Sequence, residues 1–402
     1  MRKRDDGVNR RDFLKIGSGA PGLLASAISL PPGAFAAPPA NIRITDVKFL
    51  RLRFPGRTPR IRNAIIESGG GPPEMMQLEI YTDAGIIGRS LPAGATHIIE
   101  GELLPRIKGQ NPFFIEQIWD RMYRYNRKPV AKGEYIRAMG AVDLALWDMI
   151  GKALELPVYK VLGAFRDEIR VYAAGGYYEE GKTISDLVKE MEGYVNEGFR
   201  TVKMKVGGEG FATDVERIRA VREALGPNID IMMDANGKWR AYEAIRFGRA
   251  VEKYNPYWFE EPVEPDDYAG SAEVKKALDT PVVMGENEFT RWGCRELIQA
   301  GSADILNFDT VIAGGITECR KIAALASAFH IPVAPHGSPF MAAHLLASTS
   351  NGLIMETYPG IESRYNPALP LYPVKNGYIR VPEKPGLGID PDPEIVKKYR
   401  VE

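Results

Sequence analysis

Three acidic residues of the sequence are evenly spaced, and each ends a short β-rich run. Asp234, Glu260 and Glu286 are separated by the same interval, since 260 − 234 and 286 − 260 are both 26. If the three runs are neighbouring parallel strands, their carboxylates meet at one point, where they repel one another unless a cation is bound. Oxygen ligands alone favour a hard divalent ion, Mg²⁺ before Zn²⁺. The spacing therefore predicts a Mg²⁺ site, although an acid after a strand can also simply cap the next helix.

Two lysines precede these acids on another β-rich run. Alternation along Lys203-Met204-Lys205 points both ammonium groups to one face, while Val202, Met204 and Val206 point to the other. We expect the lysines to face the interior or mouth of the barrel. The alternative is a solvated pair on an edge strand, but the apolar residues on the opposite face point towards the helices, which argues against it. Mutual repulsion is expected to lower the pKa of one lysine and make it a usable base near neutral pH.

An acid and an imidazole end two later runs, at Asp309 and His336. As lateral neighbours, the carboxylate would fix the tautomer of the imidazole and raise its pKa. Lys205 and His336 would then approach a bound ligand from opposite sides, which suits removal of a proton from the carbon next to a carboxylate. A metal would stabilise the resulting enediolate, Lys203 would add positive charge, and Glu356 could donate a hydrogen bond if protonated. The other histidines near this region, His330 and His344, are expected to be structural.

The runs that position these residues alternate with helical stretches after residue 165. Alternating β and α units of this number and length predict a closed parallel barrel, with the site at the carboxyl ends of its strands. A doubly wound open sheet is the alternative, but no Gly-rich turn follows the first run. The eight runs are Ile169–Ala173, Thr201–Val206, Asp230–Asp234, Tyr257–Glu260, Val282–Glu286, Asp304–Asp309, Pro332–His336 and Leu353–Glu356.

An α+β domain is expected before the barrel, over residues 41–165. Ile42–Phe54 and Met75–Thr82 alternate like strands, and Pro112–Tyr125 and Ile136–Leu154 have helical spacing. The barrel would span residues 166–362, and the Pro- and Gly-rich segment 363–402 would return to the first domain.

The N-terminus has the pattern of an export signal over residues 1–36. Arg10-Arg11-Asp12-Phe13-Leu14-Lys15 is followed by a weakly apolar stretch and by Ala34-Phe35-Ala36. This run resembles the twin-arginine signal, whose cargo is exported folded. We therefore expect a periplasmic protein without membrane association after processing; a disordered basic tail is the alternative.

The composition narrows the function classes. Lys+Arg and Asp+Glu both count 52, so no basic excess indicates nucleic-acid binding. Only Cys294 and Cys319 occur, which excludes a disulfide framework and a Cys-rich metal site, and the sequence leaves open whether they pair.

Six motifs in order resemble the mandelate racemase branch of the enolase superfamily. They are Lys-x-Lys, Asp-Ala-Asn, Phe-Glu-Glu-Pro, Gly-Glu-Asn, Asp-x₄-Gly-Gly-Ile-Thr and Ala-Pro-His-Gly. The resemblance implies an α+β capping domain over a modified TIM barrel, (β/α)₇β, in a homo-oligomer. It implies one Mg²⁺ per subunit held by Asp234, Glu260 and Glu286. It also implies Lys205 and His336 as the acid/base pair, Asp309 as the partner of His336, and Glu356 near the enediolate. The chain departs from the family at Asn307-Phe308, where Gln-Pro is frequent.

The predicted reaction is dehydration of a sugar acid, with racemisation, epimerisation or cycloisomerisation as the nearest alternatives. The loop 54–63 is expected to set specificity, because Arg57, Arg60 and Arg62 crowd together there and could bind a distal carboxylate or hydroxyls. They could equally be a solvated loop. Asn236 is the other candidate for substrate binding. Two further classes fit less well. A periplasmic binding protein would show an internal duplication, and none is visible in the sequence. A zinc hydrolase would carry His-x-His on the first strand, where this sequence has no histidine.

Overall fold

A computed structural model of the chain describes residues 41–91, 95–125, 132–359, 367–369 and 372–401. The export signal predicted over residues 1–36 lies outside these residues. From residue 39 onwards the chain forms one compact unit. No helix in the described ranges combines the length and the apolar character that crossing a membrane requires.

The first sheet is antiparallel and has the strand order β14-β1-β4-β5. β1 (Ile44–Arg53) and β4 (Glu74–Thr82) confirm the two predicted strands, and a turn at residues 83–85 leads from β4 into β5 (Ile87–Ser90). Alternate side chains of β1 and β4 are buried, which matches one packed face and one solvated face. The segment between β1 and β4 forms a short hairpin of β2 (Ile61–Arg62) and β3 (Glu67–Ser68).

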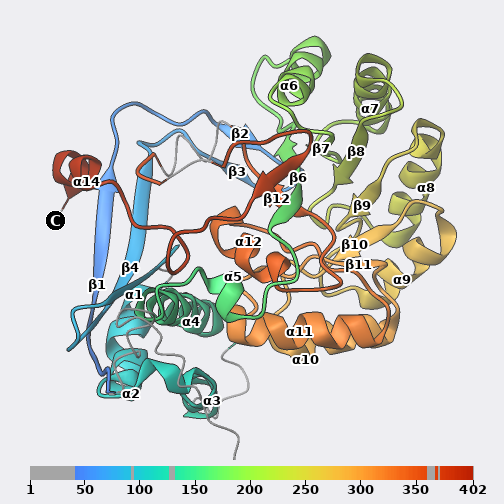
Figure 1. The fold of residues 1–402 in the computed structure, drawn as a ribbon. Helices are drawn as coiled ribbons and strands as arrows, with labels where there is room; N and C mark the ends of the chain where they lie inside the picture. The colour runs from blue at the N-terminus through green and yellow to red at the C-terminus, as the bar shows by residue number, and fades with distance from the viewer. Residues whose placement is uncertain (1–40, 92–94, 126–131, 360–366, 370–371, 402) are drawn as a thin grey trace, which may run out of the picture. The chain divides into compact units, whose positions relative to one another are not determined.

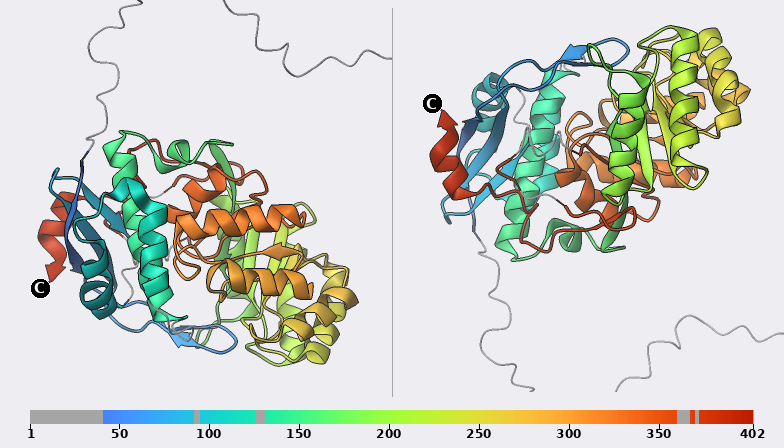
Figure 2. Two further views of the ribbon diagram at one scale, coloured as in Figure 1. Left: turned by 90° about the horizontal axis from the view of Figure 1, so that it is seen from below. Right: turned by 90° about the horizontal axis from the view of Figure 1, so that it is seen from above.

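Helices pack against this sheet and against one another. They are α1 (Thr96–Ile98), the π-helix Ile99–Leu103, α2 (Leu104–Ile107), the 3₁₀ turn Pro112–Phe114, α3 (Ile115–Tyr125), α4 (Glu134–Ala153) and α5 (Val158–Val161). α4 is buried along nearly its whole length, because it lies between β4 and β5 on one side and α11 on the other (Figure 2).

A curved parallel sheet follows, in the order β11-β10-β9-β8-β7-β6-β12 (Figure 1). Its strands are β6 (Glu168–Gly175), β7 (Thr201–Lys205), β8 (Asp230–Asp234), β9 (Trp258–Glu260), β10 (Val282–Met284), β11 (Ile305–Leu306) and β12 (Met355–Thr357). The intervening helices are α6 (Ile184–Asn196), α7 (Phe211–Leu225), α8 (Ala241–Val251) with the 3₁₀ turn Glu252–Tyr254, α9 (Tyr268–Ala277), α10 (Thr290–Ala300), α11 (Ile316–Ala328) and α12 (Pro339–Ala347).

The sheet closes through the segment that contains the seventh predicted strand. Val333 forms isolated bridges with Leu306 on one side and Gly352 on the other. The prediction of a regular strand at Pro332–His336 is wrong, because Pro332 and Pro335 have no N–H to donate to a ladder. The closed arrangement confirms the modified barrel and excludes the open doubly wound sheet.

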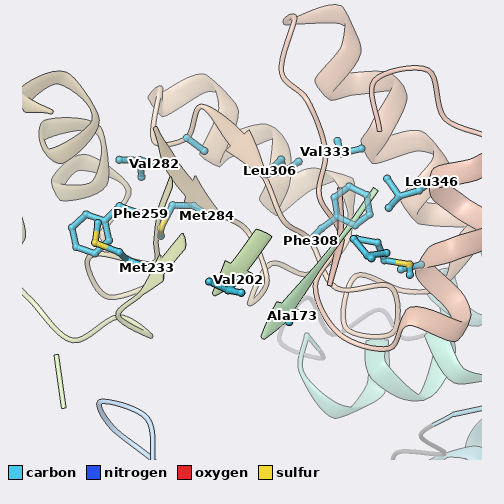
Figure 3. Close-up of a cluster of buried hydrophobic side chains, with 14 of the residues drawn as sticks. Ala173, Val202, Met233, Phe259, Val282, Met284, Leu306, Phe308, Val333 and Leu346 are labelled. Carbon is cyan, nitrogen blue, oxygen red and sulfur yellow. The ribbon is translucent and has the colours of Figure 1, made fainter. Parts of the chain in front are cut away.

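The two faces of the barrel strands have different surroundings. Val202 and Met204 belong to the outer core, as predicted from the alternation around the two lysines. Figure 3 shows Val202 in this cluster. The inner face carries a smaller apolar cluster that includes Tyr172, Met232 and Trp258. Lys203 and Lys205 share that inner face.

The C-terminal segment contacts both sheets. β13 (Tyr378–Arg380) pairs antiparallel with β6, and β14 (Arg400–Val401), which follows α14 (Pro393–Tyr399), pairs antiparallel with β1. Cys294 in α10 and Cys319 in α11 are both buried free thiols, so no disulfide joins them.

Candidate active site

Three site residues stand side by side at the carboxyl ends of adjacent strands. Lys205 ends β7, Asp234 ends β8 and Glu260 ends β9, and the strand register places Lys205 opposite Asp234 and Asp234 opposite Glu260. Glu286 lies two residues beyond β10, where Gly285 adopts a φ of 130° that few other residues could adopt. All four residues are buried.

Lys203 links carboxylates from three strands. Its Nζ lies 3.0 Å from Glu260 Oε1, 2.6 Å from Glu356 Oε1 and 3.4 Å from Asp234 Oδ2. Lys205 Nζ lies 2.5 Å from the same Asp234 oxygen and 5.2 Å from the centre of the Tyr177 ring. The two lysines and the carboxylates therefore form one connected cluster inside the barrel mouth.

The prediction that repulsion lowers the pKa of one lysine is wrong for this arrangement. Burial alone would lower both values, but the charges of Glu260 and Glu356 hold the pKa of Lys203 well above its ordinary value. Asp234 likewise raises the pKa of Lys205 despite burial and the neighbouring Lys203. The carboxylates around the pair outweigh the repulsion between the two ammonium groups.

Asp309 and His336 are neighbours, as predicted. The Nδ1 atom of His336 lies 3.0 Å from Asp309 Oδ2, and the other oxygen of Asp309 accepts hydrogen bonds from the main-chain N–H groups of Val311 and Ile312. The carboxylate is thus fixed and orients the ring. The pKa of His336 is raised well above its ordinary value although burial opposes this, because Glu286, Glu356 and Asp309 surround the ring.

Glu356, on β12, joins the imidazole to the lysines. Its Oε2 lies 3.7 Å from His336 Nε2, and Oε1 contacts Lys203. Burial would raise the pKa of Glu356, but Lys203 and His336 lower it to about 2. Glu356 could donate a hydrogen bond only if protonated, and its lowered pKa disfavours the protonated form in this arrangement.

Asn307 bridges two of the candidate metal ligands. Its Nδ2 donates to Glu260 Oε1 at 3.1 Å and to Glu286 Oε2 at 3.3 Å. Sequence reasoning noted this position only as a departure from a family pattern. The alternation from Ile305 through Asn307 to Asp309 places all three on the inner face and could have identified it.

The donor set fits a hard divalent cation. Burial raises the pKa of Glu260 well above its ordinary value, and the charges of Asp234, Glu286 and Glu356 raise it further although Lys203 opposes them. Positive charge is therefore in deficit at Glu260. Within the described residues, no group of three acidic, histidine or cysteine side chains already has a metal-holding arrangement. The ligand roles of Asp234, Glu260 and Glu286 remain a prediction.

The candidate substrate-binding residues lie in three places. Asn236 follows Asp234 in the left-handed region, with a φ of 46°, and its Oδ1 is buried without a hydrogen-bond partner in the described structure. Arg60 lines a cavity of about 600 Å³ with Arg62 and Lys182. Arg57 lines a separate cavity against α14, and its Nε donates to the carbonyl of Gly70. The expected crowding of the arginines is therefore wrong for Arg57, because the loop folds back on residues 70 and 71.

Arg62 holds the β2–β3 hairpin against the barrel. It exchanges main-chain hydrogen bonds with Tyr178, and its guanidinium lies over the Tyr178 ring and contacts Gly208 and Glu209. Both terminal nitrogens of this guanidinium donate to the barrel domain, at Gly208 and Glu209. Arg62 therefore positions the hairpin.

His344 is structural, as expected. Its Nδ1 accepts from the main-chain N–H of Tyr159, and its Nε2 bonds the carbonyl of Leu387. Burial lowers its pKa to about 4, so the ring is neutral.

Comparisons with known proteins identify the family of this chain. The mandelate racemase/muconate lactonizing enzyme N-terminal domain matches residues 72–163, and the enolase C-terminal domain-like family matches residues 186–395. An arabinonate dehydratase of Saccharolobus solfataricus is 32% identical over 370 residues, which cover 89% of this chain and 99% of the relative.

Solved structures of similar fold and sequence include a racemase and a sugar-acid dehydratase. A racemase from Streptomyces coelicolor A3(2) with bound magnesium has a TM-score of 0.80 and 30% identity, covering 89% of this chain and 100% of that one. L-Talarate dehydratase from Polaromonas sp. JS666, complexed with Mg and L-glucarate, has a TM-score of 0.79 and 30% identity, covering 90% and 98%.

Proposed function

Because this chain is an enzyme that belongs to the mandelate racemase and muconate lactonizing enzyme family of the enolase superfamily, we propose that it dehydrates a sugar acid. The observation that carries the proposal is the placement of Lys205 and of the Asp309–His336 pair. Lys205 and His336 both contact the connected cluster of carboxylates: Lys205 contacts Asp234, and His336 lies near Asp309 and Glu286. The relatives named above include dehydratases of a sugar monoacid and a sugar diacid.

The reaction removes a proton from the carbon next to the carboxylate and hydroxide from the next carbon. The electron pair of the broken C–H bond forms a C=C bond as the C–O bond breaks, and the resulting enol tautomerises to a 2-keto acid. One side chain must accept the α-proton, and another must give a proton to the leaving hydroxide, which departs as water.

Lys205 and His336 are the side chains proposed for these two transfers. Lys205 or His336 takes the α-proton in its neutral form, and where Lys205 takes it, His336 in its charged form donates a proton to the leaving hydroxyl. Asp309 orients the ring through Nδ1, which leaves Nε2 facing Glu286 and Glu356 at 3.8 and 3.7 Å. Lys203 adds positive charge deep in the site.

A divalent cation is the proposed cofactor, with one Mg²⁺ per subunit held by Asp234, Glu260 and Glu286. When bound, it would supply positive charge to the substrate carboxylate as negative charge builds on it during proton removal. Asn236 and Arg60 are the proposed substrate contacts, and Arg57 is not among them because it lies in the separate cavity against α14. The unpartnered Oδ1 of Asn236 supports the first of these.

The test is a screen of the purified protein with Mg²⁺ against mono- and diacid sugars, including stereoisomers of arabinonate and talarate. Release of a 2-keto acid is expected for at least one of them, with loss of the α-hydrogen. A K205A protein that turns over at the wild-type rate would contradict the assignment.

Racemisation, epimerisation or cycloisomerisation on the same site is the second candidate, because racemisation needs only the two opposed proton carriers and a neighbour of this fold is a racemase. Each substrate is incubated in D₂O and followed by NMR. Exchange of the α-hydrogen without keto acid indicates racemase or epimerase chemistry, whereas keto-acid formation indicates the dehydratase.

We also propose export to the periplasm by the twin-arginine route, and assembly into a homo-oligomer. The Arg10-Arg11 pair and the Ala34-Phe35-Ala36 exit support export. An R10K/R11K double variant is expected to stay in the cytoplasm on cell fractionation, whereas unchanged periplasmic recovery contradicts the route. Light scattering of the mature protein tests the oligomer.

A further inference from the structure

Asn307 is the one neutral side chain named here that contacts two candidate ligand carboxylates from two different strands. Its amide nitrogen lies 3.1 Å from Glu260 Oε1 and 3.3 Å from Glu286 Oε2, so each of its two hydrogens faces one carboxylate. The residue is 2% exposed, and its Oδ1 has no hydrogen-bond partner in the described structure. The side chain therefore makes its contacts through the amide nitrogen.

The main chain of Asn307 is held on both sides. Its N–H donates to the carbonyl of Met284 at the end of β10, and its own carbonyl accepts from the N–H of His336. The amide thus projects from a fixed point between the strand that leads to Glu286 and the segment that carries the imidazole.

The charge of the bridging group decides what it can do. Lys203 also contacts Glu260, but its ammonium neutralises a carboxylate and competes with any cation. The neutral Asn307 amide donates to both Glu260 and Glu286 and so holds the two carboxylates close without adding a positive charge. A divalent ion would therefore meet two ligands already held at a set separation, with no competing cation at this point.

We propose that Asn307 is a positioning residue that sets the separation of Glu260 and Glu286 and thereby the affinity of the site for a divalent cation. The inference rests on the proposed function, which assigns those two carboxylates as ligands. Hydrogen-bonding partners of ligand side chains commonly contribute about 10–100-fold to metal affinity.

The test measures Mn²⁺ binding to the folded protein without substrate, by electron paramagnetic resonance. N307L removes both amide hydrogens at similar volume and is expected to raise the Kd for Mn²⁺ by about 10–100-fold. N351L is the matched control, because Asn351 also donates its amide to two acceptors, the main-chain oxygens of Ala323 and Ile331, away from the carboxylates. N351L is expected to lower the unfolding temperature and leave the Kd unchanged.

N307A is measured in parallel, in case leucine prevents folding. Its Kd for Mn²⁺ is also expected to rise. An unchanged Kd in a folded N307L or N307A protein overturns the inference, as does equal weakening in N351L. If the wild-type protein itself binds no Mn²⁺, the ligand assignment in the proposed function fails. If the wild type binds and the Asn307 variants bind equally well, only the positioning role fails.

Discussion

Gly140 of α4 offers a sharp test of how the capping helix supports the site. A Cβ at this position would lie 2.1 Å from the carbonyl oxygen of Val311 and 3.1 Å from the main-chain nitrogen of Gly315. Ordinary contact begins at 3.4 Å, so the helix or the 310–315 loop must move by at least about 1 Å. G140A is therefore expected to be destabilising by about 1–3 kcal/mol.

The matched control is G193A in α6. Gly193 is also inside a helix, but a Cβ there meets nothing within 4 Å. The same substitution should therefore stabilise the protein by about 0.5–1 kcal/mol through helix propensity and reduced freedom of the unfolded chain. The two alanine variants are expected to differ by about 1.5–4 kcal/mol in the free energy of unfolding, measured by urea denaturation.

The displacement should also reach the catalytic residues. Val311 follows Asp309 closely, and its N–H donates to the carboxylate that orients His336. A shift of about 1 Å in a positioning element can cost on the order of 10²-fold in rate, so G140A should lose activity while G193A keeps it. If G140A matches G193A in stability, or turns over at the wild-type rate, the contact does not constrain the loop as argued.

Three further predictions concern chemistry and pH. K205A and H336N are each expected to lower kcat for keto-acid release by about 10²–10⁴-fold with the fold intact by circular dichroism, and a normal rate in either would place the proton transfer elsewhere. EDTA is expected to abolish turnover and Mg²⁺ to restore it, and full activity in EDTA would exclude the metal role. Burial raises the pKa of Asp143, which accepts from the Thr317 N–H, from 3.8 to about 7. The folded chain then holds this proton more tightly than the unfolded chain, so the stability contribution is present below about pH 4 and is lost as the pH rises to 7. Relative to wild type, D143N should gain up to about 1.4 kcal/mol per pH unit over that window in urea unfolding, and a constant difference would contradict this.

The inner-face residues of the barrel could be predicted because strand alternation is a short-range rule. Lys203 and Lys205 face inward as the apolar residues between and beside them indicate, and the equal spacing of the acids places Asp234 beside Glu260. Asp309 and His336 meet for the same reason.

The protonation states could not be predicted, because they depend on every charge within reach. Two lysines one residue apart suggest a lowered pKa, but Asp234, Glu260 and Glu356 arrive from other strands and reverse the sign. The loops could be predicted only in part, since the direction of the Arg57 side chain is set by the main-chain carbonyl of Gly70, which is 13 residues away in the sequence.

The pairing of β14 with β1 constrains how a nascent chain matures. Arg400 and Val401 lie opposite Leu52 and Arg51, so the outer edge of β1 keeps open main-chain hydrogen-bonding groups until translation has passed residue 401. β1 therefore gains this neighbour only after about 350 further residues have been synthesised, and removal of Arg400 and Val401 should leave an unpaired edge that favours aggregation.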